Sequence, residues 1–428
     1  MANRSAQDIR RLNRFEVLRR FHASAGPRTR QDLASETALS FATVSNLASE
    51  LIGEGVLVEA GHAESGGGRP RALLALNADR GTLVGVDVGE TSVRTELFDL
   101  ALGKMAVDER PVAPGDVTPD QIADLIEAGV DAILAAAESP RSRVLGAGIS
   151  LPGLVERERG VSTYSPYWAW RDVPMRERLA ERLELPVHLD NPLKASALAE
   201  MWFGAGRDVD NLVVVMLRSG VGAGLALDGT LYRGATNSAG EWGHSCLVFE
   251  GRRCRCGNLG CVEAYVGTAG IAETLRSLAP DDPLLAEAGD FAASLLTGLA
   301  ARAGAGDPIA VAVIRRTAAY LGAALGNLVN ILNPEVLVLG DQVAAHLGER
   351  LLTQTRAALA GHSLAQPLRA VMLRLSSLPQ DAVSRGAAAL AFEGFLNDRE
   401  VFGPVSRTRA ARARAEGRED GRIPSHSP

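Results

Sequence analysis

The chain has 428 residues, which is enough for two or three domains. Hydrophobic residues make up 46% of the sequence and charged residues 22%, a composition typical of a globular protein rather than a disordered or fibrous one. A net charge of −6 excludes a protein that is basic over its whole surface, although a small DNA-binding domain on an acidic body would give the same average. We expect no membrane-spanning segment and no secretory signal, and therefore a cytoplasmic protein.

Residues 1–77 are expected to form a winged helix-turn-helix domain. A basic amphipathic helix is predicted over residues 8–23, with Ile9 on its apolar face. A capping box at residues 29–32 predicts the start of a second helix, because Thr29 and Asp32 can each accept a hydrogen bond from the other's backbone amide. A third helix is expected over residues 41–52, capped by the residue before it.

The third helix and the wing carry the candidate DNA contacts. Residues 56–58 and 73–76 are predicted as the two wing strands, joined by a glycine-rich loop. Small polar side chains on an exposed helix can lie close to base edges in the major groove, and an arginine held by Gly and Pro can enter a minor groove or meet phosphate. A helical protein-interaction module with a basic loop is the alternative. The candidate DNA-binding residues are Thr43, Ser45, Asn46, Ser49, Arg69 and Arg71.

Residues 78–396 alternate between strands and helices, which predicts an α/β fold. The last segment, residues 397–428, has almost no large apolar side chains and is predicted to be a disordered tail. Trp168 and Trp170 could wall a pocket, but core packing is the preferred interpretation. Strands are expected at residues 82–88, 94–98, 144–150, 187–189, 212–217, 224–227 and 336–339, with helices at 119–137 and from 194.

Four potential metal ligands lie within one short segment that runs from Glu241 to Glu263. They are His244, Cys254, Cys256 and Cys261. One imidazole and three thiolates form the closed tetrahedral shell that structural zinc takes, and glycines between them permit tight turns. The fourth cysteine, Cys246, is expected to be an ordinary core residue.

The segment resembles the signature of the ROK family of sugar kinases and sugar-responsive repressors. The family pattern is Glu-x-Gly-His followed by Cys-x-Cys-Gly-x-x-Gly-Cys-x-Glu, and residues 241–244 and 254–263 match it in type and spacing. The Gly-Arg-Pro of the wing loop also resembles the DNA-binding segment of ROK repressors. The resemblance implies a two-lobed actin-like ATPase fold after the winged helix-turn-helix, and it covers the chain up to about residue 396.

The resemblance also implies a sugar site. Carboxylates and amides that bond sugar hydroxyls are natural partners in a cleft, and His244 could bind zinc through one nitrogen and a hydroxyl through the other. The sugar-binding residues carried over from the family are Gly153, Asn191, Glu241, His244 and Glu263.

The chain departs from the kinase members of the family at the catalytic base. The family's aspartate follows the pocket asparagine and removes the proton from the attacking sugar hydroxyl. Here that position holds Pro192, and the loss of a positioned general base typically costs about 10²–10⁴ in rate. Asp190 lies two positions away and would need a different backbone path to replace it.

Two nucleotide-binding motifs are altered as well. Glu90 replaces a glycine of the first phosphate loop, and Asp341 replaces the second glycine of the adenosine region. A carboxylate beside phosphate adds like charge. The second loop, residues 219–224, retains its glycines, although a hairpin that needs glycine for its own geometry is the preferred interpretation.

These observations predict a sugar-responsive DNA-binding regulator, most simply a repressor, that is not an enzyme. Its expected partners are double-stranded operator DNA, a sugar or sugar phosphate, a structural Zn²⁺ ion and further copies of itself in a homodimer or homotetramer. An ATP-dependent sugar kinase with an added DNA-binding domain is the alternative. Sequestration of the regulator by a transport protein is a third possibility that the sequence neither supports nor excludes.

Overall fold

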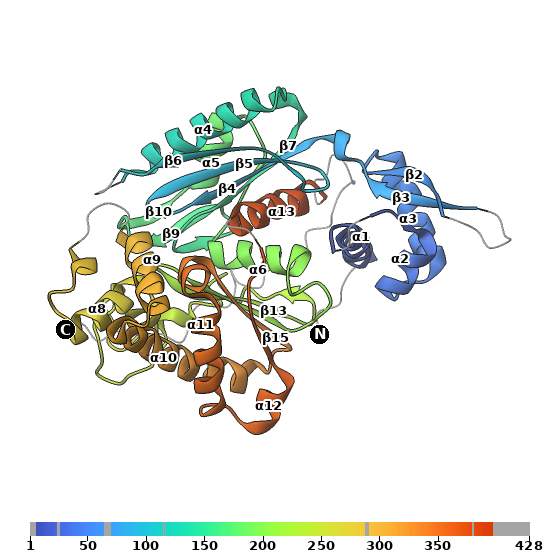
Figure 1. Cartoon of the computed structure of the whole chain (residues 1–428). Coiled ribbons are helices and arrows are strands. Elements are labelled where there is room, and N and C mark those ends of the chain that lie inside the picture. Colours follow the sequence, from blue (N-terminus) through green and yellow to red (C-terminus); the bar gives the residue numbers. More distant parts are fainter. Residues whose placement is uncertain are drawn as a thin grey trace, which may run out of the picture.

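A computed structural model describes residues 6–23, 26–63, 70–113, 115, 117–286, 291–378 and 381–396. Two α/β lobes lie one above the other, and a smaller winged helix-turn-helix unit packs at one side of both (Figure 1). The predicted tail at 397–428 and the wing loop that contains Arg69 fall outside the described residues.

The N-terminal unit has the predicted order of helices and wing strands. Thr29 accepts a hydrogen bond from the Asp32 amide and Asp32 accepts one from the Thr29 amide, so the predicted capping box is confirmed. The wing strands are longer than predicted and run out to the undescribed loop. The elements are α1 (Ala6–Ala23), α2 (Arg30–Thr37) and α3 (Phe41–Gly53), with a sheet of order β1 (Arg28–Thr29), β3 (Arg71–Leu76) and β2 (Leu57–Ala63).

The predicted apolar face of α1 is wrong at one residue. Ile9 is 49% exposed, whereas Val17 and Leu18 are fully buried. The buried apolar side chains of α1 therefore lie in its C-terminal half, because that half packs against the rest of the chain.

The first lobe is built on a five-stranded mixed sheet of order β11-β7-β4-β5-β6. Strands β4 and β7 have the predicted ranges, β5 and β11 are slightly longer than predicted, and β6 is a strand that was not predicted from the sequence. Strand β4 pairs in parallel with β7 and antiparallel with β5. A smaller antiparallel sheet of β8, β9 and β10 adjoins it. The elements are β4 (Thr82–Val88), β5 (Ser92–Asp99), β6 (Lys104–Pro111), α4 (Pro119–Ala136), β7 (Val144–Ser150), β8 (Leu154–Glu156), β9 (Val161–Ser165), β10 (Trp170–Val173), α5 (Met175–Leu183) and β11 (Val187–Asp190).

The second lobe repeats the same strand pattern in the order β14-β13-β12-β15-β16. Its first strand pairs antiparallel with its second and parallel with its fourth, as in the first lobe. The elements are α6 (Pro192–Phe203), β12 (Leu212–Leu217), β13 (Val221–Leu227), β14 (Thr230–Leu231), α7 (Glu263–Val266), α8 (Thr268–Leu278), α9 (Phe291–Gly304), α10 (Pro308–Leu332), β15 (Val336–Gly340), α11 (Asp341–Ala360), α12 (Ala365–Ala370) and β16 (Met372–Leu375). The chain then returns to the first lobe as α13 (Ala382–Leu396).

Helix α13 lies between the sheet of the first lobe and helix α6 (Figure 1). Glycines make this close packing possible. A Cβ on Gly85 or Gly148 would lie 2.0 Å and 1.7 Å from carbonyl oxygens of α13, and one on Gly386 would lie 1.9 Å from the Ala195 carbonyl of α6. The C-terminal helix thus joins the two lobes through backbone-to-backbone contact, so α6 and α13 are expected to move as one unit.

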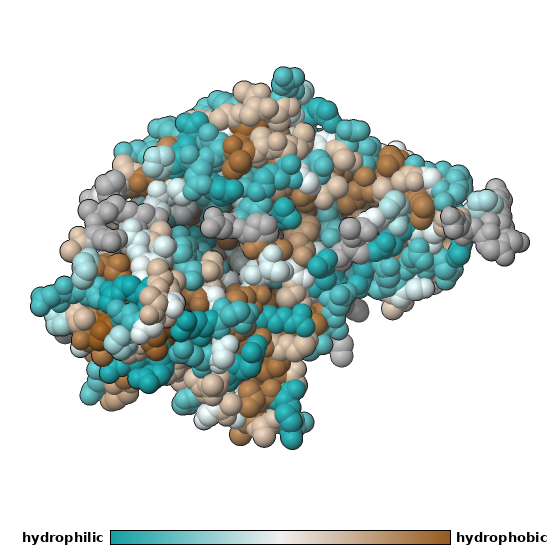
Figure 2. All heavy atoms as spheres, in the orientation of Figure 1, coloured by the Kyte–Doolittle hydropathy of each residue, from teal (hydrophilic) through white to brown (hydrophobic). Residues whose placement is uncertain are grey.

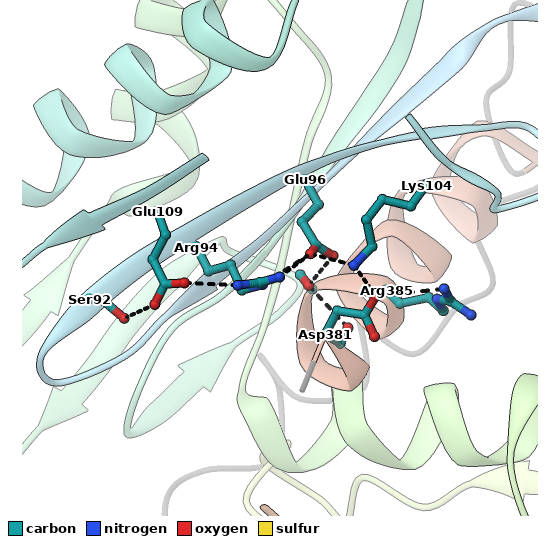
Figure 3. Close-up of polar contacts among 8 residues, drawn as sticks. Ser92, Arg94, Glu96, Lys104, Glu109, Asp381 and Arg385 are labelled. Atoms are coloured by element: carbon teal, nitrogen blue, oxygen red, sulfur yellow. Dashed lines mark hydrogen bonds and ion pairs between the residues drawn. The ribbon is translucent and has the colours of Figure 1, made fainter. Parts of the chain in front are cut away.

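A buried polar network fixes the start of α13 to the first lobe (Figure 3). Glu96 is fully buried, and it accepts hydrogen bonds from Arg94 at 3.0 Å and from the Ser384 hydroxyl at 2.7 Å. Lys104 bridges Glu96 and Asp381. The buried carboxylate is therefore fully paired, as its burial requires.

Helix α10 is the one helix in the described part of the chain that is long and apolar enough to cross a bilayer. Its apolar face is buried in the core of the second lobe, where it packs against α8, α9 and α11. Hydrophilic and hydrophobic atoms are mixed over the visible face of both lobes (Figure 2). The composition of α10 is accounted for by this core packing.

The winged helix-turn-helix unit shares a hydrophobic core with the body. His22 of α1 stacks on Trp202 of α6 at 5.1 Å between ring centroids, and it meets Phe392 of α13 edge-on at 5.2 Å. Phe15 contacts the same Trp202 ring at 5.4 Å. Aromatic pairs at these distances are stabilising beyond the area they bury, so α1 is anchored directly to the ends of α6 and α13.

The burial of His22 predicts that the free energy of unfolding depends on pH. Burial lowers the pKa of His22 to about 3, against an opposing backbone hydrogen bond to Ala101. Because the unfolded chain takes up this proton near its ordinary pKa of about 6.5, stability should be complete above that pH and fall as the pH drops towards 3. We expect His22 to contribute a slope of up to about 1.4 kcal/mol per pH unit to the free energy of unfolding.

Chemical denaturation of the full chain between pH 7 and pH 4 would measure this slope. A His22→Phe variant keeps a ring in the interface but should lose its share of the slope, whereas His62→Gln, on the exposed wing strand β2, should keep it. Equal slopes in the wild-type and His22→Phe proteins would contradict the prediction.

Candidate functional site

The four predicted metal ligands converge on one point. Their ligand atoms all lie within 4.8 Å of one another. The Cys256 and Cys261 sulfurs are 3.8 Å apart, and the Cys254 sulfur is 3.7 Å from Nδ1 of His244. A tetrahedral zinc ion with Zn–S bonds of about 2.3 Å would hold two sulfurs about 3.8 Å apart and a sulfur and a nitrogen about 3.6 Å apart. The residues therefore fit a tetrahedral metal ion.

The chemistry of the cluster also favours a bound cation. Burial raises the pKa of the Cys254 thiol, and burial likewise raises that of Cys261. Without a positive charge the sulfurs would stay protonated, and they would lie close together with little to hold them. A metal ion replaces those protons and couples its own binding to the folding of the loop.

Two glycines let the loop fold around the cluster. Gly257 and Gly260 have φ values of +97° and +76°, and a Cβ on Gly260 would lie 1.8 Å from the Val248 carbonyl oxygen. These positions confirm the expected tight turns. Cys246 was predicted to be a core residue, which is wrong: its side chain is exposed, because it lies on the outer edge of the loop opposite Cys261.

The five predicted sugar-binding residues line one cavity of about 310 Å³ between the lobes. Asn191 caps helix α6 through its carbonyl oxygen, which accepts from the Lys194 amide at 3.2 Å. The Asn191 amide nitrogen lies 3.4 Å from both the Gly153 carbonyl and a Glu241 carboxylate oxygen. Gly153 has a φ of +92° and packs against the backbone of Tyr164, where a Cβ would collide. The asparagine thus ties a first-lobe loop to a second-lobe carboxylate.

The aromatic residues of the cavity differ from the candidates considered from the sequence. Trp168 and Trp170 are 4% and 5% exposed and pack on each other in the core of the first lobe, which confirms the preferred interpretation. Tyr164 and Tyr167 line the cavity instead. An aromatic ring beside carboxylates and an amide is a common wall for a sugar ring.

Glu241 and Glu263 are both held in place before any ligand binds. Burial raises the pKa of Glu241, and Lys194 and His244 oppose the shift. Glu263 accepts from the Val221 amide at 3.0 Å through one oxygen and from Arg255 Nε at 3.0 Å through the other. These carboxylates can accept hydrogen bonds from hydroxyls without reorganisation.

Two cavity residues were missed at the sequence level. Arg255 lies between the metal ligands Cys254 and Cys256, and its guanidinium joins Glu263 to Glu90, whose carboxylate is 2.6 Å away. From the sequence, Glu90 is recognisable only as the residue that replaces a glycine of the first phosphate loop. The sequence could have indicated Arg255, because it lies between the metal ligands Cys254 and Cys256. The side chain of a residue held between two ligands points away from the metal.

A second cavity of about 600 Å³ adjoins the first and contains the positions that the resemblance assigns to nucleotide phosphate and adenosine. Arg218 lines both cavities and pairs with Asp341 at 2.7 Å and with Asp87 at 3.7 Å. Gly222 and Gly224 of residues 219–224 serve the packing of α6, since a Cβ on Gly224 would lie 2.2 Å from the Leu193 carbonyl and one on Gly222 would meet the Leu193 side chain. This supports the structural interpretation of that loop.

Pro192 lines the first cavity, where the resemblance implies a sugar site, and it is the first residue of α6. Asp190 is fully buried, and its carboxylate is engaged by Arg233 at 3.0 Å and by Asn237 at 2.9 Å. It therefore cannot turn to the cavity in place of the missing aspartate.

The candidate DNA contacts lie on the surface of the winged helix-turn-helix unit. Asn46, Ser49 and Arg71 are exposed, and Thr43 and Ser45 are half-buried. Two of the hydroxyls already form hydrogen bonds within the helix and its cap: that of Thr43 with the Ser40 hydroxyl, and that of Ser49 with the Ser45 carbonyl. Asn46 therefore has the most freedom to meet a base edge, and Arg69 lies outside the described residues.

Comparison with known proteins agrees with these features. A profile of the ROK family matches residues 83–393. A xylose repressor from Caldicellulosiruptor bescii is 32% identical over 380 residues, which are 86% of this chain and 92% of that protein. A glucokinase from Halalkalibacterium halodurans is 32% identical over 306 residues, 70% of this chain and 91% of the enzyme. The crystal structure of a ROK family transcriptional regulator, a homolog of the E. coli MLC protein, has a TM-score of 0.75 at 27% identity and covers 92% of this chain and 99% of its own.

The metal site can be tested by its stoichiometry and its effect on stability. We expect about one metal ion per chain in the purified protein, and we expect Cys256→Ser to lose it and to melt several degrees lower, because the ion holds the loop together. Cys246→Ser is the matched control and should keep both the metal and the melting temperature. Elemental analysis and thermal unfolding would measure the two quantities, and full metal retention in Cys256→Ser would contradict the assignment.

Proposed function

Since this chain belongs to the ROK family, we propose that it is a sugar-responsive transcriptional repressor. The winged helix-turn-helix unit binds operator DNA, and a sugar bound between the lobes releases it. The observation that carries this proposal is that a single helix, α6, begins at the sugar cavity and ends against the DNA-binding unit.

The two ends of α6 are tied to the two functions. At its start, Asn191 contacts Glu241 and the Gly153 loop. At its end, Trp202 packs against Phe15 and His22 of α1. An α-helix of twelve residues spans about 18 Å, and it transmits displacement because its hydrogen bonds make it rigid along its axis.

Sugar binding would change the position of α6 through its first turn. A sugar hydroxyl that bonds Asn191, Glu241 or Glu263 favours one degree of lobe closure over another, and α6 and α13 carry that change to α1. In a homodimer or homotetramer the two DNA-binding units would then no longer match two half-sites. A coupling free energy of about 1–3 kcal/mol is enough for an inducer of this kind.

The DNA interface would consist of the exposed face of α3 and the wing. Asn46 is placed to read a base edge, since an asparagine amide can both donate to and accept from adenine. The other candidates, Thr43, Ser45, Ser49, Arg69 and Arg71, would add shorter contacts to bases and phosphates. A regulator of this kind acts in the cytoplasm, where its operator lies.

The ion in the Cys₃His cluster is proposed to be zinc with a structural role. It would be held by Cys254, Cys256, Cys261 and Nδ1 of His244. Zinc bound there keeps the histidine neutral and fixes its ring, which leaves Nε2 as the nitrogen available to a sugar hydroxyl. Through the same loop the ion supports Arg255 and Glu263.

We propose that the chain does not phosphorylate its sugar. Pro192 offers no base, and Arg218 engages both Asp87 and Asp341 in the second cavity. Glu90 adds negative charge beside the phosphate position. The glucokinase relative shows that the fold itself is compatible with a kinase, so the argument depends on these substituted residues.

The repressor proposal can be tested by fluorescence anisotropy on the DNA upstream of the chain's own gene, with and without xylose, glucose and N-acetylglucosamine. Asn46→Ala should weaken DNA binding by about tenfold, the effect of losing one good base contact, with sugar affinity unchanged. Glu241→Ala should bind DNA normally but no longer be released by the sugar. Glu349→Ala, exposed on α11 in the second lobe, is the control.

Specific binding that one sugar releases in the wild type and in Glu349→Ala would support the proposal. If the same sugar concentration also released the Glu241→Ala variant from DNA, the cavity would be assigned wrongly. A wild-type protein with no affinity for any tested operator would overturn the repressor function.

The kinase alternative predicts sugar-dependent formation of ADP from MgATP. We expect none above background in the wild type. We expect none in Pro192→Asp either, although a positioned base typically contributes about 10²–10⁴ in rate, because Glu90 and Asp341 still replace two glycines of the nucleotide-binding motifs. Sugar-dependent ADP formation by the wild type in a coupled assay would restore the kinase interpretation.

A further inference from the structure

We propose that Arg255, held between Glu90 and Glu263, makes the sugar cavity selective for uncharged sugars over sugar phosphates. The inference rests on the proposed sugar-binding function and names the class of ligand. It concerns two residues that neither the metal site nor the set of sugar contacts includes.

The position of Arg255 is fixed from three directions. Its backbone lies between two metal ligands, its Nε donates to Glu263 at 3.0 Å, and its Nη1 lies 2.6 Å from Glu90. The guanidinium rests on Gly220, where a Cβ would approach Nη2 to 2.7 Å. A side chain constrained in this way is not free to swing towards an incoming anion.

The charge of Arg255 is already balanced before any ligand enters. Its two carboxylate partners belong to different lobes, since Glu90 follows β4 and Glu263 begins α7. The other guanidinium in the wall, that of Arg218, is likewise engaged by Asp87 and Asp341. No excess positive charge therefore remains on either arginine for a phosphate.

The charges around the cavity add up to a negative total. Among the described residues that line it or form an ion pair with its lining, there are five carboxylates and two arginines, which gives −5 + 2 = −3. Three thiolates and one divalent ion would add a further −1. The carboxylates are Asp87, Glu90, Glu241, Glu263 and Asp341, and the cations are Arg218 and Arg255.

An uncharged sugar suits this environment because its hydroxyls can donate to the carboxylates and accept from Nη2 of Arg255 without changing the charge balance. A phosphate group would face repulsion that the paired arginines do not offset. Glu90 is the residue that distinguishes the two cases, since without its charge Arg255 would be paired with Glu263 alone and an incoming phosphate would meet one negative charge fewer.

The experiment is isothermal titration of the full, metal-loaded chain with matched pairs of ligands: glucose and glucose 6-phosphate, and N-acetylglucosamine and N-acetylglucosamine 6-phosphate, with xylose as a further neutral probe. The wild type should bind one neutral sugar at least about tenfold more tightly than any phosphate. In Glu90→Gln the phosphate should gain about tenfold relative to the neutral sugar. Glu109→Gln, whose carboxylate pairs with Arg94 and Ser92 on the second cavity (Figure 3), should leave the ratio unchanged.

A wild-type protein that prefers a sugar phosphate would overturn the inference while leaving the repressor proposal intact. An unchanged ratio in Glu90→Gln would also overturn it, since the charge of Glu90 is its cause. If no sugar of either class binds the cavity or releases DNA, both the inference and the proposed function fail.

Discussion

The packing of helix α6 is the constraint on which the rest of the structure depends. Its first turn forms part of the sugar cavity, its side meets α13 and strand β13 at backbone distance, and its last turn holds the DNA-binding unit. The close contacts at Gly224 and Gly386 leave no space for a side chain in between. Since densely packed interfaces do not deform gradually, a ligand at one end of such a helix acts on the other end by shifting a whole packed unit.

Two arginines at the lobe interface, Arg218 and Arg255, line the first cavity between the lobes. Arg218 and Arg255 each pair with one carboxylate of the first lobe and one of the second. Such pairs stabilise a particular arrangement of the lobes, and they reduce the need for a nucleotide to bring the lobes together. In the proposed regulator, these pairs leave lobe closure to respond to the sugar alone.

The metal cluster connects these features through one short loop. His244 belongs both to the cluster and to the cavity, and Arg255 and Glu263 lie beside the ligands in sequence. The loop has no long helix or strand, and backbone hydrogen bonds such as those donated by Leu247 and Val262 order it only locally. Four bonds to one ion would order the loop as a whole and, with it, the Glu263 carboxylate and the Arg255 guanidinium.

The sequence by itself determined what depends on short separations along the chain. The capping box at Thr29, most strand positions, the Cys₃His spacing and the loss of the base at Pro192 could all be identified because each is encoded within a few residues. Only the tertiary structure decided which distant residues meet: Glu90 and Arg255 are 165 positions apart, and His22 reaches Trp202 across the domain boundary. Ile9 and Cys246 were misassigned for the same reason, since local hydrophobicity does not say whether a neighbour from elsewhere in the chain will cover a side chain.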